Sequence, residues 1–141
     1  YKYYEGRFDR LPDFAKLTPK KTGFTKNFAL ETLAEQEDYY AFVFEGLVNI
    51  PITGVYHFFT ISDDGSKLYI DNQVVVDNDG SHSERRRTGL VALEKGFHPI
   101  RIEYFEDYDG QTLHIGYQDA SGQIYNLSEK DLFYKKKISK K

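Results

Sequence analysis

Two adjacent acids, Asp63 and Asp64, are the residues in this chain best suited to chemistry, within the segment Ser62-Asp63-Asp64-Gly65-Ser66. Apolar, β-type segments flank them on both sides, which predicts a tight turn. Neighbouring carboxylates repel each other, and a turn does not need both. Two interpretations stay open: the acids accept backbone hydrogen bonds and join two loops, or they hold a hard cation such as calcium, which prefers oxygen ligands.

A second polar loop, residues 77–82, has a similar composition. Asp77, Asn78 and Asp79 resemble part of a calcium loop, but the distal Glu and the flanking helices of an EF-hand are missing. We interpret the loop as a structural turn, with Asp77 or Asp79 as additional cation ligands in the alternative. His82 in the same loop is either a solvated side chain or a hydrogen-bonding partner for a sugar hydroxyl.

Aromatic residues make up 16% of the chain, and most of them are expected in the core or on a sheet face. Tyr108 is the exception because it lies between Asp107 and Asp109 in an acidic loop. A ring in such a loop is poorly suited to a core but well suited to stacking on a sugar ring. We therefore predict Tyr108 as a ligand-binding residue.

Nothing in the sequence favours catalysis. Glycoside hydrolysis needs a pair of carboxylates, but a chain with 22 acidic residues offers many such pairs, so their presence does not separate an enzyme from a binding domain. Ser81 and His82 lack the strand-turn-helix context of a nucleophile elbow. The four His residues show no metal-ligand spacing, and the absence of Cys removes thiol nucleophiles and disulfides. The sequence predicts a non-catalytic domain.

Charge is distributed unevenly along the chain. Five Lys residues gather at 135–141, and without them 14 basic and 22 acidic residues leave a body of charge −8. An acidic body argues against nucleic acid as a partner and suits a divalent cation. No stretch approaches the roughly 18 apolar residues of a membrane span. The chain also lacks Met, which is typical of an excised module or a mature fragment.

The elements that would position these residues are predicted to be short strands separated by turns. Apolar runs bounded by turn residues predict strands at 39–50, 55–61, 67–70, 73–76, 89–93, 97–105, 113–117 and 124–127. Asp71-Asn72 predicts a hairpin turn, because these residues tolerate positive φ. We interpret residues 84–87 as a solvated loop and the first 30 residues as a capping or edge segment. Ser128 and Asp131 predict one short helical turn.

The pattern is typical of an all-β fold, an antiparallel barrel-like sandwich with little or no helix. Residues 1–134 are expected to form one domain, and 135–141 a basic tail or linker. Several motifs in order also resemble the PA14 domain family. They are Tyr3-Tyr4-Glu5-Gly6, Leu11-Pro12-Asp13-Phe14, Phe44-Glu45-Gly46, Gly54-Val55-Tyr56-His57-Phe58, Ser62 to Asp71, Val75 to Gly80, Gly96 to Ile100 and Glu103 to Glu106.

The resemblance implies a site. In the adhesin branch of PA14 domains, two consecutive Asp joined by a cis peptide bind calcium, and the calcium binds sugar hydroxyls. The matching residues here are Asp63 and Asp64. The adhesins add an Asn from a later loop, and Glu106 stands at that position, with backbone oxygens near Tyr108 as further ligands. The adhesin disulfides and large insertion are missing, so the chain looks closer to the bacterial, glycosidase-associated branch.

Together these observations predict a carbohydrate-binding module, assisted by calcium, that targets a parent glycosidase or surface protein to glycans. The expected location is secreted, periplasmic or at the bacterial cell surface. The alternative is a structural module that packs against a neighbouring domain of the parent protein without binding sugar.

Overall fold

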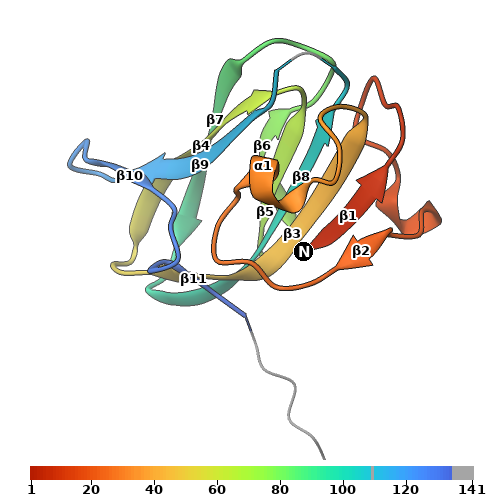
Figure 1. Ribbon diagram of the computed structural model, residues 1–141. Helices are drawn as coiled ribbons and strands as arrows, with labels where there is room; N and C mark the ends of the chain where they lie inside the picture. Colours follow the sequence, from red (N-terminus) through yellow and green to blue (C-terminus); the bar gives the residue numbers. More distant parts are fainter. Residues whose placement is uncertain (109, 135–141) are drawn as a thin grey trace, which may run out of the picture.

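The computed structural model describes residues 1–108 and 110–134. They form two antiparallel sheets packed face to face (Figure 1). The larger sheet has the order β2-β1-β3-β8-β5-β6, with β11 also paired to β3; these strands are β1 (Lys2–Glu5), β2 (Lys21–Thr22), β3 (Tyr40–Ile50), β5 (Ser66–Ile70), β6 (Gln73–Asn78), β8 (Gly96–Glu106) and β11 (Leu132–Phe133). The smaller sheet has the order β10-β9-β4-β7, with β4 (Gly54–Asp63), β7 (Arg85–Leu93), β9 (Thr112–Gln118) and β10 (Ile124–Asn126).

The first half of strand β3, residues 40–44, is buried on both faces, which explains its continuous apolar sequence. Alternate residues of a strand point to opposite sides. One set, including Phe42 and Phe44, joins the main core between the sheets. The other set, Ala41 and Val43, packs on the opposite face in a smaller cluster that includes Phe14. The N-terminal segment therefore covers the outer face of the larger sheet.

The strand predictions are largely confirmed. Tyr40–Ile50 and Gly54–Asp63 match the expected strands, and β5 and β6 form the expected hairpin. Both turn residues have positive φ, 54° at Asp71 and 64° at Asn72. The only described helices are α1 (Leu30–Leu33) and the 3-10 turn η1 (Phe14–Lys16). The all-β sandwich is confirmed.

Three local predictions were wrong or incomplete. Residues 85–87 are not a loop, because they pair with Thr60 to Ser62 as the first part of β7. The expected helical turn at Ser128 is a hydrogen-bonded turn that leads into β11. The N-terminal segment caps the sheet as expected, but β1 lies inside it, between β2 and β3. The predicted tail, residues 135–141, lies outside the described residues.

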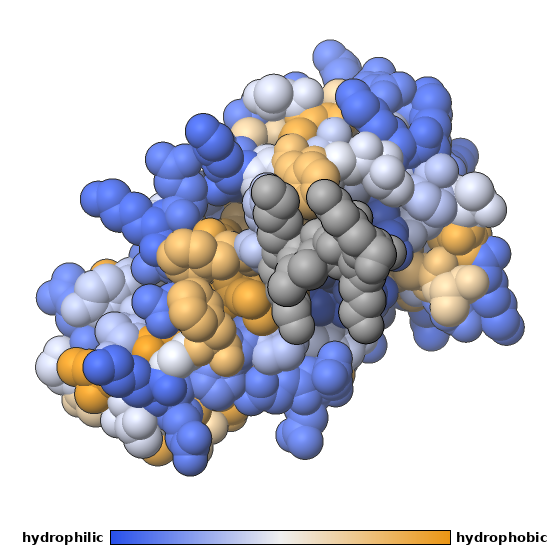
Figure 2. Space-filling view, turned by 90° about the horizontal axis from the view of Figure 1, so that it is seen from below, coloured by the Kyte–Doolittle hydropathy of each residue, from blue (hydrophilic) through white to orange (hydrophobic). Residues whose placement is uncertain are grey.

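An apolar surface lies at the end of the sandwich where β11 and the start of β8 meet. Phe24 and Tyr134 pack with ring centroids 4.8 Å apart, and Phe97 and Phe133 pack at 5.2 Å. We call these four residues the aromatic patch. They are 44% to 78% exposed. A cavity of about 310 Å³ beside them is lined by Tyr1 and Phe24 among others. Figure 2 looks at this end and shows apolar surface gathered there.

Neither described helix is long and apolar enough to cross a membrane.

Candidate functional site

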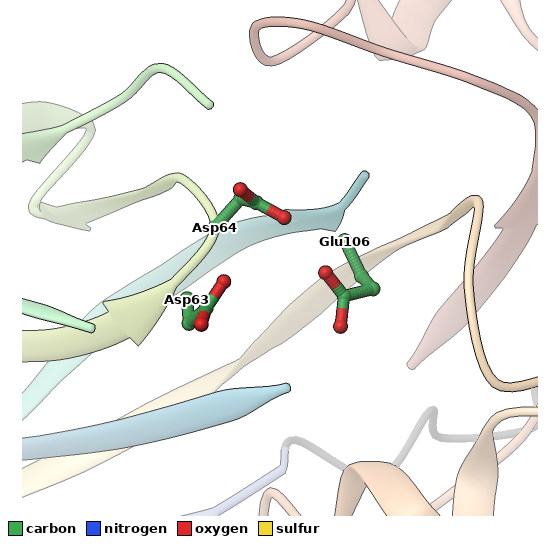
Figure 3. Close-up of side chains that lie close together, drawn as sticks. All are labelled: Asp63, Asp64 and Glu106. Atoms are coloured by element: carbon green, nitrogen blue, oxygen red, sulfur yellow. The ribbon is translucent and has the colours of Figure 1, made fainter. Parts of the chain in front are cut away.

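Three carboxylates converge at the other end of the sandwich. Asp63 is the last residue of β4, Asp64 follows it, and Glu106 is the last residue of β8. Each residue offers an oxygen atom such that all three oxygens lie within 4.8 Å of one another. Figure 3 shows the Glu106 carboxylate directed toward the two Asp side chains. Because β4 and β8 belong to different sheets, the site joins the ends of both.

The backbone around the two Asp residues is tightly fixed. The peptide bond between Asp63 and Asp64 is cis, as the family resemblance implied. The Tyr104 hydroxyl donates a hydrogen bond to the Asp63 carbonyl oxygen. A Cβ atom on Gly65 would lie 2.8 Å from the backbone nitrogen of Gly80. A larger residue at position 65 would therefore push apart the two loops that meet here.

Asp64 is held by backbone groups from two loops. Its Oδ1 accepts the His82 N–H at 3.0 Å, and its Oδ2 accepts the Asp107 N–H at 2.7 Å. The Ser81 hydroxyl also lies 3.4 Å from Oδ1. The side chain is almost fully buried. These bonds hold the carboxylate in one orientation, and they are the bonds expected if the acids join two loops.

Glu106 differs from Asp64, because no such donors from the described residues hold its carboxylate. The residue is 0% exposed, and neither carboxylate oxygen has a hydrogen-bond partner among residues 1–108 and 110–134. Burial, with the nearby carboxylates of Asp64 and Asp63, raises the pKa of Glu106 to about 10. A buried carboxylate without a partner is costly, so its position beside two more acids fits a candidate cation site. Calcium takes six to eight oxygen ligands, and these three residues supply carboxylate oxygens.

A buried polar network supports the second loop. The Asn78 amide donates to the Thr60 and Ser62 hydroxyls at 3.2 Å and to the Arg85 carbonyl at 2.8 Å. The Arg85 guanidinium donates to Asn78 Oδ1 and to the Asp79 carbonyl. Sequence reasoning missed this network. The available signal was polar residues at inward positions of β4, where an apolar residue is expected.

The structure brings Asp63, Asp64 and Glu106 together, and their role as metal ligands stays a prediction. The backbone of His82 binds Asp64, while its ring nitrogens lie 2.7 and 2.8 Å from two carbonyl oxygens. Tyr108 is 63% exposed on the adjacent loop, and its neighbour 109 lies outside the described residues. The sugar-contact roles of His82 and Tyr108 also stay predictions.

The second acidic loop does not join the three carboxylates among the described residues. Asp79 Oδ1 accepts the backbone N–H groups of Leu11 at 2.8 Å and Gly80 at 2.7 Å. Asp77 accepts the Asp79 N–H at 3.1 Å. These bonds are typical of the structural turn that the sequence favoured.

Comparison with known proteins agrees with this geometry. The profile of the PA14 domain matches residues 2–130. The chain belongs to the PA14 domain family. A β-hexosaminidase of Porphyromonas gingivalis is 42% identical over 57 residues, which cover 40% of this chain and 7% of the enzyme. The PA14 domain thus matches less than a tenth of that relative's length.

Two solved PA14 domains share the fold. The PA14 domain of the MpAFP antifreeze protein superposes with a TM-score of 0.74 at 15% identity, covering 93% of this chain and 87% of that one. The PA14 sugar-binding domain from an RTX adhesin gives 0.62 at 21% identity, covering 68% and 55%. Identities this low establish the fold alone.

Proposed function

We propose that this PA14 domain is a non-catalytic carbohydrate-binding module in which Asp63, Asp64 and Glu106 hold a calcium ion. PA14 domains are often carbohydrate-binding and generally lack catalytic activity of their own. The observation that carries the proposal is the fully buried Glu106 carboxylate, which has no hydrogen-bond partner in the described part of the chain and faces two other acids. Bound calcium would supply positive charge and open coordination positions for sugar hydroxyls.

The residues at this site have different roles in the proposed binding. Asp63 is partly exposed, whereas Asp64 and Glu106 are buried. The N–H groups of His82 and Asp107 fix the Asp64 carboxylate before any ligand arrives. Such preorganisation lowers the entropy cost of binding. The exposed Tyr108 ring on the adjoining loop is available to a sugar face.

The biological role that we propose is targeting. The match to a β-hexosaminidase suggests a parent protein that acts on glycans. A tethered binding module raises the effective concentration of a catalytic domain at its substrate. We place such a protein outside the bacterial cytoplasm, secreted, periplasmic or on the cell surface, where polymeric glycans are met.

One observation favours a second candidate function. The aromatic patch exposes large apolar side chains, including Phe24 at 78% and Phe97 at 58%. Exposed apolar clusters often mark interaction surfaces. The domain would then pack against a neighbour in its parent protein and need no sugar.

The calcium part is tested by thermal unfolding. Calcium is titrated into chelator-treated protein and the melting temperature is followed. A ligand at 100 times its Kd stabilises the folded state by about 2.7 kcal/mol, so a shift of several degrees is expected. The variant Asp64→Asn should lose the shift. Glu84→Gln is the matched control, because Glu84 is an exposed acid of the next loop.

The sugar part is tested on a glycan array, with calcium and with chelator. Calcium-dependent signal supports the proposed module. Absence of signal across the array under both conditions rejects it and leaves the packing role. If wild type also shows no calcium shift at millimolar calcium, the cation site itself is refuted.

A further inference from the structure

A pocket adjoins the three carboxylates on the side of the N-terminal segment. It has a volume of about 480 Å³ and is lined by six residues: Arg7, Phe8, Asp9, Arg10, Pro12 and Asp107. Asp107 connects it to the carboxylate site, because the Asp107 N–H donates the 2.7 Å bond to Asp64. Asp107 is therefore shared between the wall of the pocket and the backbone that holds Asp64.

The segment that forms the pocket is anchored to the same loops that fix Asp64. The Leu11 N–H donates to Asp79 at 2.8 Å, and the Gly6 N–H donates to the Tyr39 carbonyl at 2.9 Å. The Tyr39 N–H in turn donates to the Asp107 carbonyl at 3.2 Å. The pocket wall and the carboxylate site are thus parts of one hydrogen-bonded assembly.

The two arginines in the pocket have no acidic partner among residues 1–108 and 110–134. By contrast, Arg101 pairs with Glu45 and Glu103. The Arg7 guanidinium lies 4.7 Å from the centre of the Tyr39 ring. Stacking on an aromatic ring orients a guanidinium while its charge and its N–H donors stay available. The pocket therefore presents two guanidinium groups that make no ion pair among the described residues, beside the carboxylates of Asp9 and Asp107.

The chemistry of the pocket fits one class of ligand. Guanidinium groups bind carboxylate, sulfate and phosphate through paired N–H donors. Phe8 and Pro12 add apolar surface for the C–H faces of a sugar, and the carboxylates of Asp9 and Asp107 accept hydrogen bonds from hydroxyls. We propose that this pocket is a subsite for the anionic group of an acidic saccharide, with Arg7 and Arg10 as its specificity-determining residues. The proposal rests on the carbohydrate-binding function proposed above.

The test compares acidic sugars with their neutral counterparts by isothermal titration calorimetry at fixed free calcium. The pairs are galacturonate with galactose and N-acetylglucosamine 6-sulfate with N-acetylglucosamine, which distinguish a carboxylate from a sulfate. A charge-assisted bidentate contact predicts about tenfold tighter binding of the acidic member of at least one pair. The variants Arg7→Gln and Arg10→Gln should each bring this ratio toward one while leaving the affinity for the neutral sugar within about twofold.

Arg86→Gln is the matched control, because Arg86 also stacks on a ring, that of Phe59 at 4.8 Å, but lies on β7 outside the pocket. It should keep the wild-type ratio. Equal affinity for both members of both pairs, or an unchanged ratio in Arg7→Gln and Arg10→Gln, overturns the subsite and leaves the proposed function standing. Binding of none of the four sugars rejects both. Acid-selective binding that survives chelation keeps the subsite and removes calcium from the proposed function.

Discussion

Glu106 places a carboxylate where neither solvent nor a donor from the described residues reaches it. Without a cation, the folded protein must keep this group protonated or carry an unpaired buried charge, and each choice costs stability at neutral pH. With a cation, the same group becomes a ligand. The calcium site that we propose thus predicts that the effect of Glu106 on stability changes sign when the ion is added.

We expect Glu106→Gln to have opposite effects in the two conditions. In chelator, the variant should be more stable than wild type by about 1–3 kcal/mol, because a neutral amide replaces an unpaired acid and its NH₂ group donates to neighbouring carboxylates. With calcium, it should lose the ligand-dependent stabilisation. Urea unfolding with and without calcium measures both effects.

Glu103→Gln is the control on the same strand. Glu103 is nearly buried but bonded, with Arg101 at 2.9 Å and the Tyr69 hydroxyl at 3.2 Å. This variant should lose stability in both conditions and keep the calcium shift. If Glu106→Gln behaves like Glu103→Gln in chelator, then Glu106 is satisfied by the protein alone and needs no cation.

Among the individual site residues, the sequence could identify the adjacent pair Asp63 and Asp64, but not the third carboxylate that joins them. The acid pair stood out because a turn does not need both residues. Glu106 is distant in sequence, and only the family resemblance linked it to the pair. The polar residues of β4 hinted at a buried network, but its partners Asn78 and Arg85 could not be found, because they lie on β6 and β7 and no local pattern shows that these strands meet.

Among the elements, the β5–β6 hairpin offers a test of turn chemistry. Ile70 pairs with Gln73, so Asp71 and Asn72 form a two-residue turn, and both have positive φ. Asn72→Val should cost about 1–2 kcal/mol, because a β-branched residue is disfavoured in the left-handed region. Asn72→Gly should be neutral or slightly stabilising, since Asp-Gly suits this turn. Chemical denaturation measures both; equal stability of the Val and Gly variants would contradict the observed turn.

The same turn is tied to β8 by a titratable contact. His98 Nδ1 lies 2.9 Å from the Asp71 carboxylate, and its Nε2 lies 2.7 Å from the Glu94 carbonyl. Partial burial lowers the pKa of His98, but the Glu94 carbonyl and the Asp71 carboxylate outweigh it, so the pKa is raised above the ordinary 6.5. The contact therefore stabilises the fold below about pH 6.5, and this contribution fades as pH rises through the raised pKa.

We expect wild type to lose up to about 1 kcal/mol relative to His98→Gln as pH rises from 5.5 to 8.5. Free energies of unfolding of both proteins across that range measure the difference. Asp71→Asn should flatten the dependence in the same way as His98→Gln. A constant difference between wild type and His98→Gln would show that the contact does not titrate within the range.

The start of β7 shows why one element was missed. Glu84-Arg85-Arg86-Arg87 reads as a solvated loop, because three consecutive cations give no alternation of apolar residues. In the structure β4 supplies the pairing, and Arg86 packs over the Phe59 ring. A long apolar neighbour can thus extend a strand through residues whose own propensity is low.

For the molecule as a whole, stability is concentrated in the aromatic core. Phe42 is 0% exposed, and its ring packs against those of Tyr1, Tyr3, Tyr40 and Phe44. Phe42→Ala should cost about 3–5 kcal/mol, because a large cavity is left between the sheets. The melting temperature measures the loss. Phe24→Ala, at an exposed ring of the aromatic patch, should change it far less, and equal losses would contradict the placement of the core.

The fold was predictable because its principal strands, such as β3, β4 and β8, are rich in apolar residues and bounded by strong turn residues. What the sequence could not specify was how the sheets are ordered. β1 lies inside the larger sheet although it is four residues long and near the start of the chain. Its position depends on long-range pairing with β3, and the sequence of a short segment flanked by polar residues does not indicate which strand it pairs with.

The aromatic patch and the three carboxylates lie at opposite ends of the sandwich. The pairing of β3 with β8 runs from Tyr40 and Glu106 at one end to Ile50 and Gly96 at the other. Tyr1 and Tyr134 both line the cavity beside the patch. A group attached to either residue therefore lies at the end of the sandwich opposite the carboxylates. A linker or biosensor surface coupled there would leave the opposite pole facing outward, so the domain can be immobilised in a defined orientation.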